Sequence, residues 1–195
     1  MRHPSVSMIR RGPMVISCVL TLLILAACQT ERVQTSDGRP MPPKPHPAPA
    51  APAGAIANRM ALLVGSKADD TNGNGYPDQI QATVVLFASP HPTPILADGA
   101  FVFSLYPMGQ AKAAGGEVLA EWRVEGEAVR ASQAVARYGP CYRFRLCLLD
   151  SVGDVHPLSR ADLVCRFEPT DGSPTVMSDG IRSIQIGRRG DSAAR

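Results

Sequence analysis

The chain has 195 residues, of which 45% are hydrophobic and 19% charged, the composition of an ordinary globular protein with room for one domain. Its formal net charge is +3, but three of its 20 basic residues precede Cys28 and no acidic residue does. From Cys28 onward the chain therefore carries 17 basic and 17 acidic side chains. Nothing in it suggests the clustered basic surface that a nucleic-acid partner needs, so that class of function is set aside.

The first 28 residues have the layout of a secretory signal peptide. Arg2, Arg10 and Arg11 precede a mostly apolar run from Val15 to Ala27, which ends in small residues. The run is too short for a comfortable membrane span, which needs about 20 apolar residues. Its last four positions, Leu25-Ala26-Ala27-Cys28, resemble the lipobox of bacterial lipoproteins.

This resemblance implies that residues 1–27 are removed and that Cys28 carries the lipid, on its sulfur and on the new N-terminus. The protein would then be held at the membrane through the lipid on Cys28. Gln29 follows the cysteine, and not the Asp associated in this family with retention at the inner membrane, so the outer membrane is the expected location. The alternative is a plain secretory signal with an incidental cysteine.

A proline-rich segment follows, over residues 28–57. It has no apolar periodicity, and proline fixes φ and removes a hydrogen-bond donor, so neither a helix nor a central strand is expected. The sequence predicts a semi-rigid spacer that rises about 3.1 Å per residue. A peptide ligand for an SH3-like domain is the alternative. The prolines are Pro40, Pro42, Pro43, Pro45, Pro47, Pro49 and Pro52.

The folded domain is expected over residues 58–187, followed by a disordered tail over 188–195. Apolar residues alternate with polar ones in short runs that Pro and Gly interrupt, which predicts an all-β fold, a β-sandwich of about seven strands. The expected strands lie at Met60–Gly65, Gln79–Phe87, Phe101–Leu105, Val118–Arg123, Tyr142–Leu148, Leu163–Phe167 and Ile184–Ile186. The run from Glu125 to Tyr138 lacks this alternation, and a short helix between the two sheets is predicted there.

The segment Asp70–Asp78 resembles the Asp-x-Asn-x-Asn-Gly calcium loop. In that family's order, Asp70, Asn72, Asn74, the Tyr76 carbonyl and Asp78 would supply oxygens, and Gly75 would give the sharp turn. The chain departs from the family at the twelfth position, where Gln81 replaces the bidentate Glu. The competing interpretation is an Asn- and Gly-rich turn between two strands.

Three cysteines remain in the folded part, and disulfides are permitted beyond the inner membrane. Cys141 and Cys147 lie in one expected strand, roughly 20 Å apart at about 3.3 Å per residue, too far for a bond. Cys147 and Cys165 are symmetric about His156-Pro157, a natural hairpin turn. The sequence therefore predicts a Cys147–Cys165 disulfide across neighbouring strands, with Cys141 free.

Signs of catalysis are few. The chain has no Gly-x-Ser-x-Gly elbow and no His-Glu-x-x-His motif. Paired carboxylates for glycoside chemistry could come from Glu117, Glu121, Glu125 and Glu127, although such residues commonly form solvated faces. Trp122 fits a core position better than a sugar-stacking platform. Arg143 and Arg145 share one strand face as a small basic stripe, which suits an anion or, more commonly, a solvated sheet surface.

Two functions are compatible with these features. The first is a lipid-anchored, non-catalytic binding or structural lipoprotein with an envelope protein or glycan as partner. The second is a small lipid-anchored hydrolase that acts on cell-envelope glycans through loop carboxylates. Calcium is the one cofactor that the sequence suggests, and no catalytic residue is assigned.

Overall fold

The computed structural model describes residues 48–111, 116–153, 155 and 157–187, which belong to one compact unit. The expected signal peptide, Cys28 and most of the proline-rich segment lie outside these residues, as does the tail. The described residues form ten strands and one helix: β1 Arg59–Val64, β2 Gln79–Phe87, β3 Pro94–Ile95, β4 Gly99–Pro107, β5 Ala120–Val124, α2 Glu127–Ala131, β6 Gln133–Ala136, β7 Gly139–Cys147, β8 Arg160–Pro169, β9 Val176–Met177 and β10 Arg182–Gln185.

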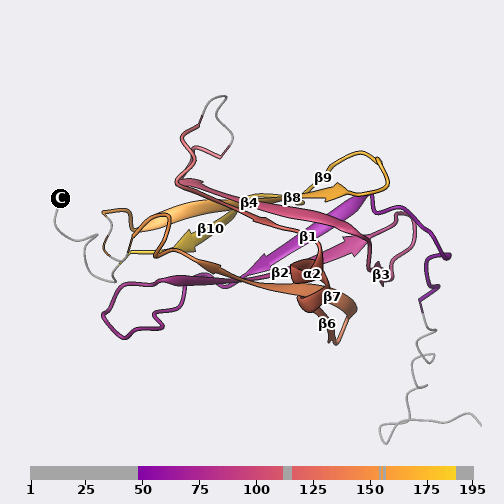
Figure 1. Ribbon diagram of the computed structural model, residues 1–195, viewed down its shortest axis with the longest axis horizontal. Coiled ribbons are helices and arrows are strands. Elements are labelled where there is room, and N and C mark those ends of the chain that lie inside the picture. The colour runs from indigo at the N-terminus through magenta and orange to yellow at the C-terminus, as the bar shows by residue number, and fades with distance from the viewer. Residues whose placement is uncertain (1–47, 112–115, 154, 156, 188–195) are drawn as a thin grey trace, which may run out of the picture. The chain divides into compact units, whose positions relative to one another are not determined.

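The strands build two antiparallel sheets, which Figure 1 shows as two layers. The first sheet has the order β1-β2-β7-β6, with β3 added beside β2. The second has the order β10-β8-β4-β5, with β9 added beside β8. The β-sandwich predicted from period-two alternation is confirmed, and each of the seven expected strands is present.

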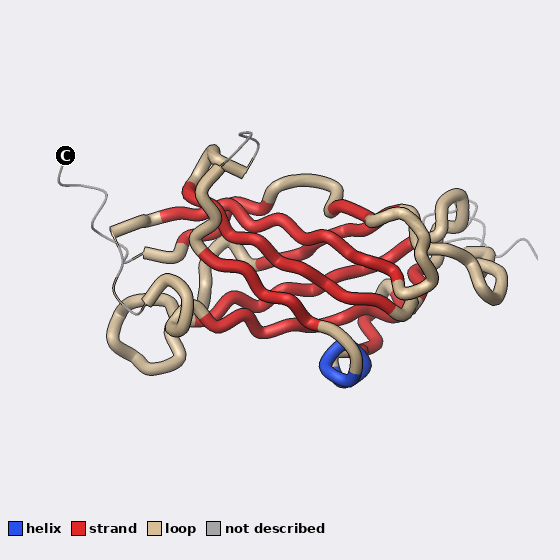
Figure 2. The backbone as a smooth tube through the Cα atoms, turned by 45° about the horizontal axis from the view of Figure 1, so that its top comes forward, coloured by secondary structure: helices blue, strands red, loops and turns tan. Residues whose placement is uncertain are grey.

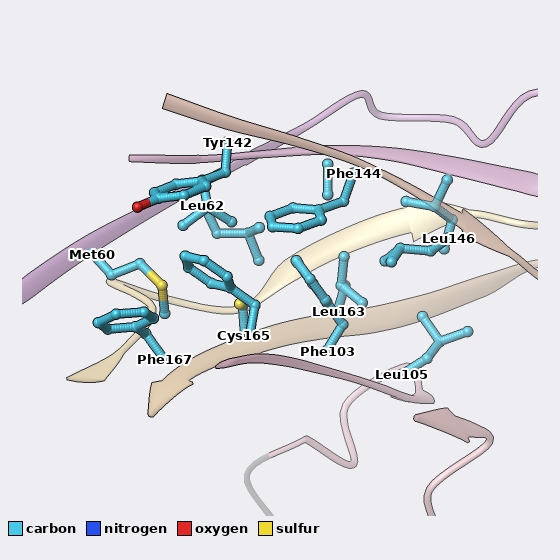
Figure 3. Close-up of a cluster of buried hydrophobic side chains, with 14 of the residues drawn as sticks. Met60, Leu62, Phe103, Leu105, Tyr142, Phe144, Leu146, Leu163, Cys165 and Phe167 are labelled. Atoms are coloured by element: carbon cyan, nitrogen blue, oxygen red, sulfur yellow. The ribbon is translucent and has the colours of Figure 1, made fainter. Parts of the chain in front are cut away.

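The core lies between the layers, where alternate residues of both sheets point toward each other (Figure 3). Phe101 is at its centre, with ring centroids 4.7 Å from Tyr142, 5.1 Å from Phe144 and 4.8 Å from Phe167. Tilted aromatic pairs of this kind are each worth about 0.5–1.5 kcal/mol beyond their buried area. The first residue of β4 is Gly99, and a larger residue would not fit there. A Cβ at this position would come within 2.5 Å of the Phe167 ring and of the Glu168 carbonyl oxygen.

One side of the sandwich is closed by a seam between β1 and the segment from Ser178 to Gln185. The Asp179 N–H donates to the Met60 carbonyl at 3.0 Å, and the Gln185 N–H donates to the Ser66 carbonyl at 2.9 Å. Between these points the Arg182 Nε donates to the Leu62 carbonyl at 2.6 Å. The Arg182 side chain thus supplies the hydrogen-bond donor for a carbonyl on the edge of β1 that no backbone N–H of the segment reaches.

The predicted helix from Glu125 to Tyr138 is correct for only part of its length. Helix α2 ends at Ala131, and the next residue, Ser132, donates from its Oγ to the Val129 carbonyl at 2.7 Å. Residues Gln133–Ala136 then form β6, which pairs with β7 at the edge of the first sheet. Hairpin pairing satisfies the free edge of β7, and this gain outweighs the helix preference of an Ala-rich segment. Figure 2 shows α2 as the one described helix, beside the strands.

Candidate functional site

The segment Asp70–Asp78 forms part of the loop between β1 and β2, at the end of the sandwich opposite the segment that leads into β1 (Figure 1). Asp69 closes its base: its N–H donates to the Gln79 carbonyl at 2.7 Å, and its carbonyl accepts the Asp78 N–H at 2.7 Å. The loop is therefore a closed excursion from the sheet with a fixed base.

Side-chain oxygens inside the loop accept its own backbone N–H groups. Asp70 accepts the Gly73 and Gly75 N–H groups on separate oxygens, both at 2.8 Å. Asn72 Oδ1 accepts the Asn74 N–H at 3.1 Å, and Asn74 Oδ1 accepts the Tyr76 N–H at 2.8 Å. The two asparagine bonds are Asx turns, and the Asp70 bonds span three and five residues; both kinds are the local side-chain bonding for which Asp and Asn are favoured in turns.

Asp78 has a different position from the other predicted ligands, because its side chain is buried beneath the loop. Its carboxylate accepts the Thr71 hydroxyl at 2.8 Å, the Thr71 N–H at 3.1 Å and the Asn72 N–H at 3.2 Å. Burial alone would raise the pKa of Asp78, but these hydrogen bonds favour the charged form and lower the pKa below its usual value. Asp78 therefore fastens the start of the loop to its end.

This geometry bears on the calcium prediction, because calcium takes six to eight oxygen ligands. Both oxygens of Asp78 are already occupied by loop donors. Gln81, at the twelfth position, donates from Nε2 to Asp69 Oδ2 at 2.7 Å and so is held at the base of the loop. Asp70 is the carboxylate with acceptor capacity left, since each of its oxygens accepts one N–H. Within the described residues, no three His, Cys, Asp or Glu side chains gather as a metal cluster. Calcium binding stays a prediction.

Of the glutamates considered for glycoside chemistry, Glu121 is in β5 and Glu125 directly follows it, and both are ion-paired, whereas Glu127 begins α2. Glu117 precedes β5. Arg123 contacts Glu125 at 2.8 Å and Glu168 at 2.6 Å. Arg166 contacts Glu168 at 2.9 Å and Glu121 at 3.7 Å. Hydrogen bonds from Arg123 and Arg166 lower the pKa of Glu168. A general acid needs a raised pKa, and Glu168, at the centre of this network, has the opposite shift.

The predicted Cys147–Cys165 disulfide is wrong in its register. Cys147 ends β7 in the first sheet, whereas Cys165 is in β8 in the second sheet, opposite Phe103 of β4. The chain changes sheets between β7 and β8, so these two strands do not form a hairpin. Cys141, Cys147 and Cys165 are free thiols, and burial strongly raises the pKa of Cys165.

The core assignment of Trp122 is confirmed. The ring is partly buried against the core, and its Nε1 donates to the Cys147 carbonyl at 3.0 Å. This bond connects β5 of the second sheet to the end of β7 in the first. The indole is a link between the two layers rather than an exposed platform.

A second candidate site lies on the outer face of the first sheet, where Arg143 and Arg145 are exposed on β7 as the alternation predicts. Beside them is an apolar hollow of about 180 Å³, lined by Ala61, Leu63, Val85, Phe87, Pro92, Pro94 and Tyr138. Alternation alone does not identify this hollow, because it assigns one face of each strand to solvent. The signal in the sequence is that β1 and the second half of β2 are apolar on both faces.

Tyr138 covers one side of this hollow from the tip of the β6–β7 hairpin. Burial raises the pKa of Tyr138, and so does the neighbouring Cys141 thiol, while the charge of Arg143 lowers it in part. The phenol is therefore close to both Cys141 and Arg143. The apolar hollow and the basic stripe are parts of one surface.

Comparison with known proteins adds no family to this description. No protein-family model matches the chain, and no curated protein matches it. Among the described residues, no helix is long and apolar enough to cross a membrane. The predicted lipidation site at Cys28 is outside those residues.

Proposed function

We propose that the protein is a lipid-anchored, non-catalytic binding lipoprotein of the bacterial cell envelope. The observation that carries this proposal is Leu25-Ala26-Ala27-Cys28 at the end of a short apolar run, with Arg10 and Arg11 before it. Gln29 after the cysteine supports the outer membrane. The proline-rich segment that follows would hold the domain away from the lipid at about 3.1 Å per residue.

A binding role is favoured over hydrolysis by the electrostatics of the domain. Glu121 and Glu125 are both ion-paired with arginines, so neither is a free carboxylate facing an open site. The outer face of the first sheet, in contrast, combines an apolar hollow with arginines that pair with no carboxylate of the described residues, a combination common at protein interfaces. The sandwich would present this face to a partner in the envelope.

Labelling with radioactive palmitate tests the anchor. We expect the full-length protein to incorporate the label, and Cys28→Ser to remain an unlabelled precursor, because acylation needs that sulfur. Cys18→Ser is the matched control: it removes another cysteine of the same segment and should leave labelling unchanged. Label in the Cys28→Ser protein would contradict the proposal. So would a Cys28→Ser protein that is cut and released in soluble form, since that is the behaviour of a plain secretory signal.

A further inference from the structure

The two outer faces of the sandwich differ in their charges. On the second sheet Arg123 and Arg166 are both held by glutamates. The strands of the first sheet, all of them described, contain three arginines and no acidic residue. Arg59, Arg143 and Arg145 are exposed on the outward side of their strands, and none forms an ion pair with a described residue.

The strand register places apolar side chains between these arginines. Across the first sheet, Arg59 is opposite Phe87, which is in turn opposite Pro94. The next outward row pairs Ala61 with Val85. The row after that contains Leu63, Thr83 and Arg143. Opposed side chains on one sheet face are about 5 Å apart, so the three rows form one continuous surface with an arginine at each of two opposite corners.

This surface is hollow as well as apolar. The hollow of about 180 Å³ is between the two corner arginines. Leu63 is 44% exposed and Tyr138 is 48% exposed, so both offer apolar surface at the wall of the hollow to a partner. The volume suits one or two apolar side chains and not a larger ligand.

The charges decide between the possible occupants. A second copy of the chain would bring three more arginines against these three, and like charges across an interface are unfavourable. A bilayer surface is flat and offers no side chain to fill a hollow. A protein segment with carboxylates around an apolar residue complements both features, since an apolar centre with a charged rim is the usual anatomy of an interface.

We propose that the outer face of the first sheet binds an acidic protein segment, which inserts one apolar side chain into the hollow and pairs carboxylates with Arg59 and Arg143. This proposal specifies the partner of the binding function proposed above and rests on it for the location in the envelope. Arg59 and Arg143 are two strands apart and four residues apart along the strand direction, roughly 16 Å at about 4.8 Å per strand and 3.3 Å per residue. An extended segment covers that distance in about five residues, so the carboxylates should flank the apolar residue at that spacing.

A random 12-residue peptide library displayed on phage is the probe. The protein is the chain from Gln29 onward, made without a lipid, since the residues from 47 onward are a compact unit of their own. We expect the enriched peptides to carry Asp or Glu on both sides of an apolar residue. A selected peptide should bind at least tenfold more weakly to Arg143→Glu and to Leu63→Thr. The same changes on the second sheet, Arg160→Glu and Met177→Thr, should leave its affinity unchanged.

Charge reversal separates loss of contact from loss of folding. A peptide with Lys in place of its acidic residues should bind Arg143→Glu better than it binds the unmodified protein. The proposal is overturned if the enriched peptides lack acidic residues or if no peptide is enriched. It is also overturned if binding is equal in Arg143→Glu and Arg160→Glu.

Two other outcomes would assign the face to a different occupant. If the protein co-sediments with phosphatidylglycerol vesicles and Leu63→Thr abolishes this co-sedimentation, the face binds a lipid surface. A dimer that Leu63→Thr dissociates would assign it to a second copy. Palmitate labelling is measured separately, so failure of the anchor and failure of this surface are distinguishable.

Discussion

Tyr142 is a buried polar side chain whose two hydrogen bonds are both made to one residue. Its hydroxyl donates to the Ala97 carbonyl at 2.9 Å and accepts the Ala97 N–H at 2.8 Å. Burial raises the pKa of Tyr142, and the bonds to Ala97 only partly compensate. The phenol therefore ties the segment between β3 and β4 to the centre of β7.

Removing this hydroxyl should be costly. In Tyr142→Phe both backbone groups of Ala97 lose their partner, and each unsatisfied buried group costs about 1–3 kcal/mol. We expect a fall of about that size in the free energy of unfolding, measured by urea denaturation. Tyr106→Phe removes the same atom from a partly exposed tyrosine of β4 and should change stability by less than about 0.5 kcal/mol. Equal effects of the two substitutions would contradict this assignment.

At the scale of elements, the seam between β1 and β10 depends on a side chain. Arg182 bridges the Leu62 carbonyl and Asp179, the latter at 2.8 Å. In Arg182→Met the carbonyl loses a charged donor, a bond worth about 1.5–3 kcal/mol. We expect a loss of stability near the lower end of that range, because the guanidinium is partly exposed.

Hydrogen exchange localises this effect. The N–H groups of Asp179 and Gln185 bond across the same seam, so their exchange should accelerate in Arg182→Met. Arg160→Met removes an exposed arginine from the neighbouring strand β8 and should change neither exchange nor stability. If exchange rises throughout the domain instead, the seam is not a local element and Arg182 acts on the whole fold.

Elements with a local signal could be predicted from the sequence. Strand β2 was expected at Gln79–Phe87 and is observed with those bounds, because nine residues of alternation leave little ambiguity. Strands β3 and β9 have two residues each, too few for any period to be recognised. The cysteine pairing failed for another reason: it depends on which sheet each strand joins, and that is decided by long-range packing.

The candidate sites divide in the same way. The hydrogen bonds that Asp70, Asn72 and Asn74 accept in the loop join residues two to five positions apart. Because these bonds are local, the sequence suggests a turn directly. The burial of Asp78 under Thr71 is less accessible, since the sequence does not say that the loop folds back over its base. The hollow around Leu63 and Phe87 requires the register of three strands and a hairpin, which no local pattern contains.

At the scale of the whole molecule, the folded state lowers the pKa of carboxyl groups in several separate parts of the domain. Hydrogen bonds from arginines lower the pKa of Glu168, the Ser173 N–H lowers that of Asp171, and Thr71 with Asn72 lowers that of Asp78. A carboxyl whose pKa is lowered by folding stabilises the native state above its unfolded pKa, and this contribution is lost as the pH falls through the folded pKa. The sandwich should therefore lose stability in acid from about pH 4 downward.

Asp78 connects this acid response to the question of calcium. In Asp78→Asn one acceptor oxygen is replaced by the NH2 group of an amide, which cannot accept from Thr71 or Asn72. We expect the melting temperature at pH 7 to fall by several degrees, and by the same amount in EDTA and in 10 mM calcium, because Asp78 fastens the loop without an ion. The variant lacks the carboxylate, so the difference from the unmodified protein should be full above the unfolded pKa of 3.8 and shrink as the pH falls below it. Asp150→Asn, in an exposed turn, is the control and should leave the melting temperature unchanged both at pH 7 and in acid.

The opposite outcome would establish the loop as a weak calcium site. In that case calcium raises the melting temperature of the unmodified protein by several degrees but does not raise that of Asp70→Ala, because the ion uses the remaining acceptor capacity of Asp70.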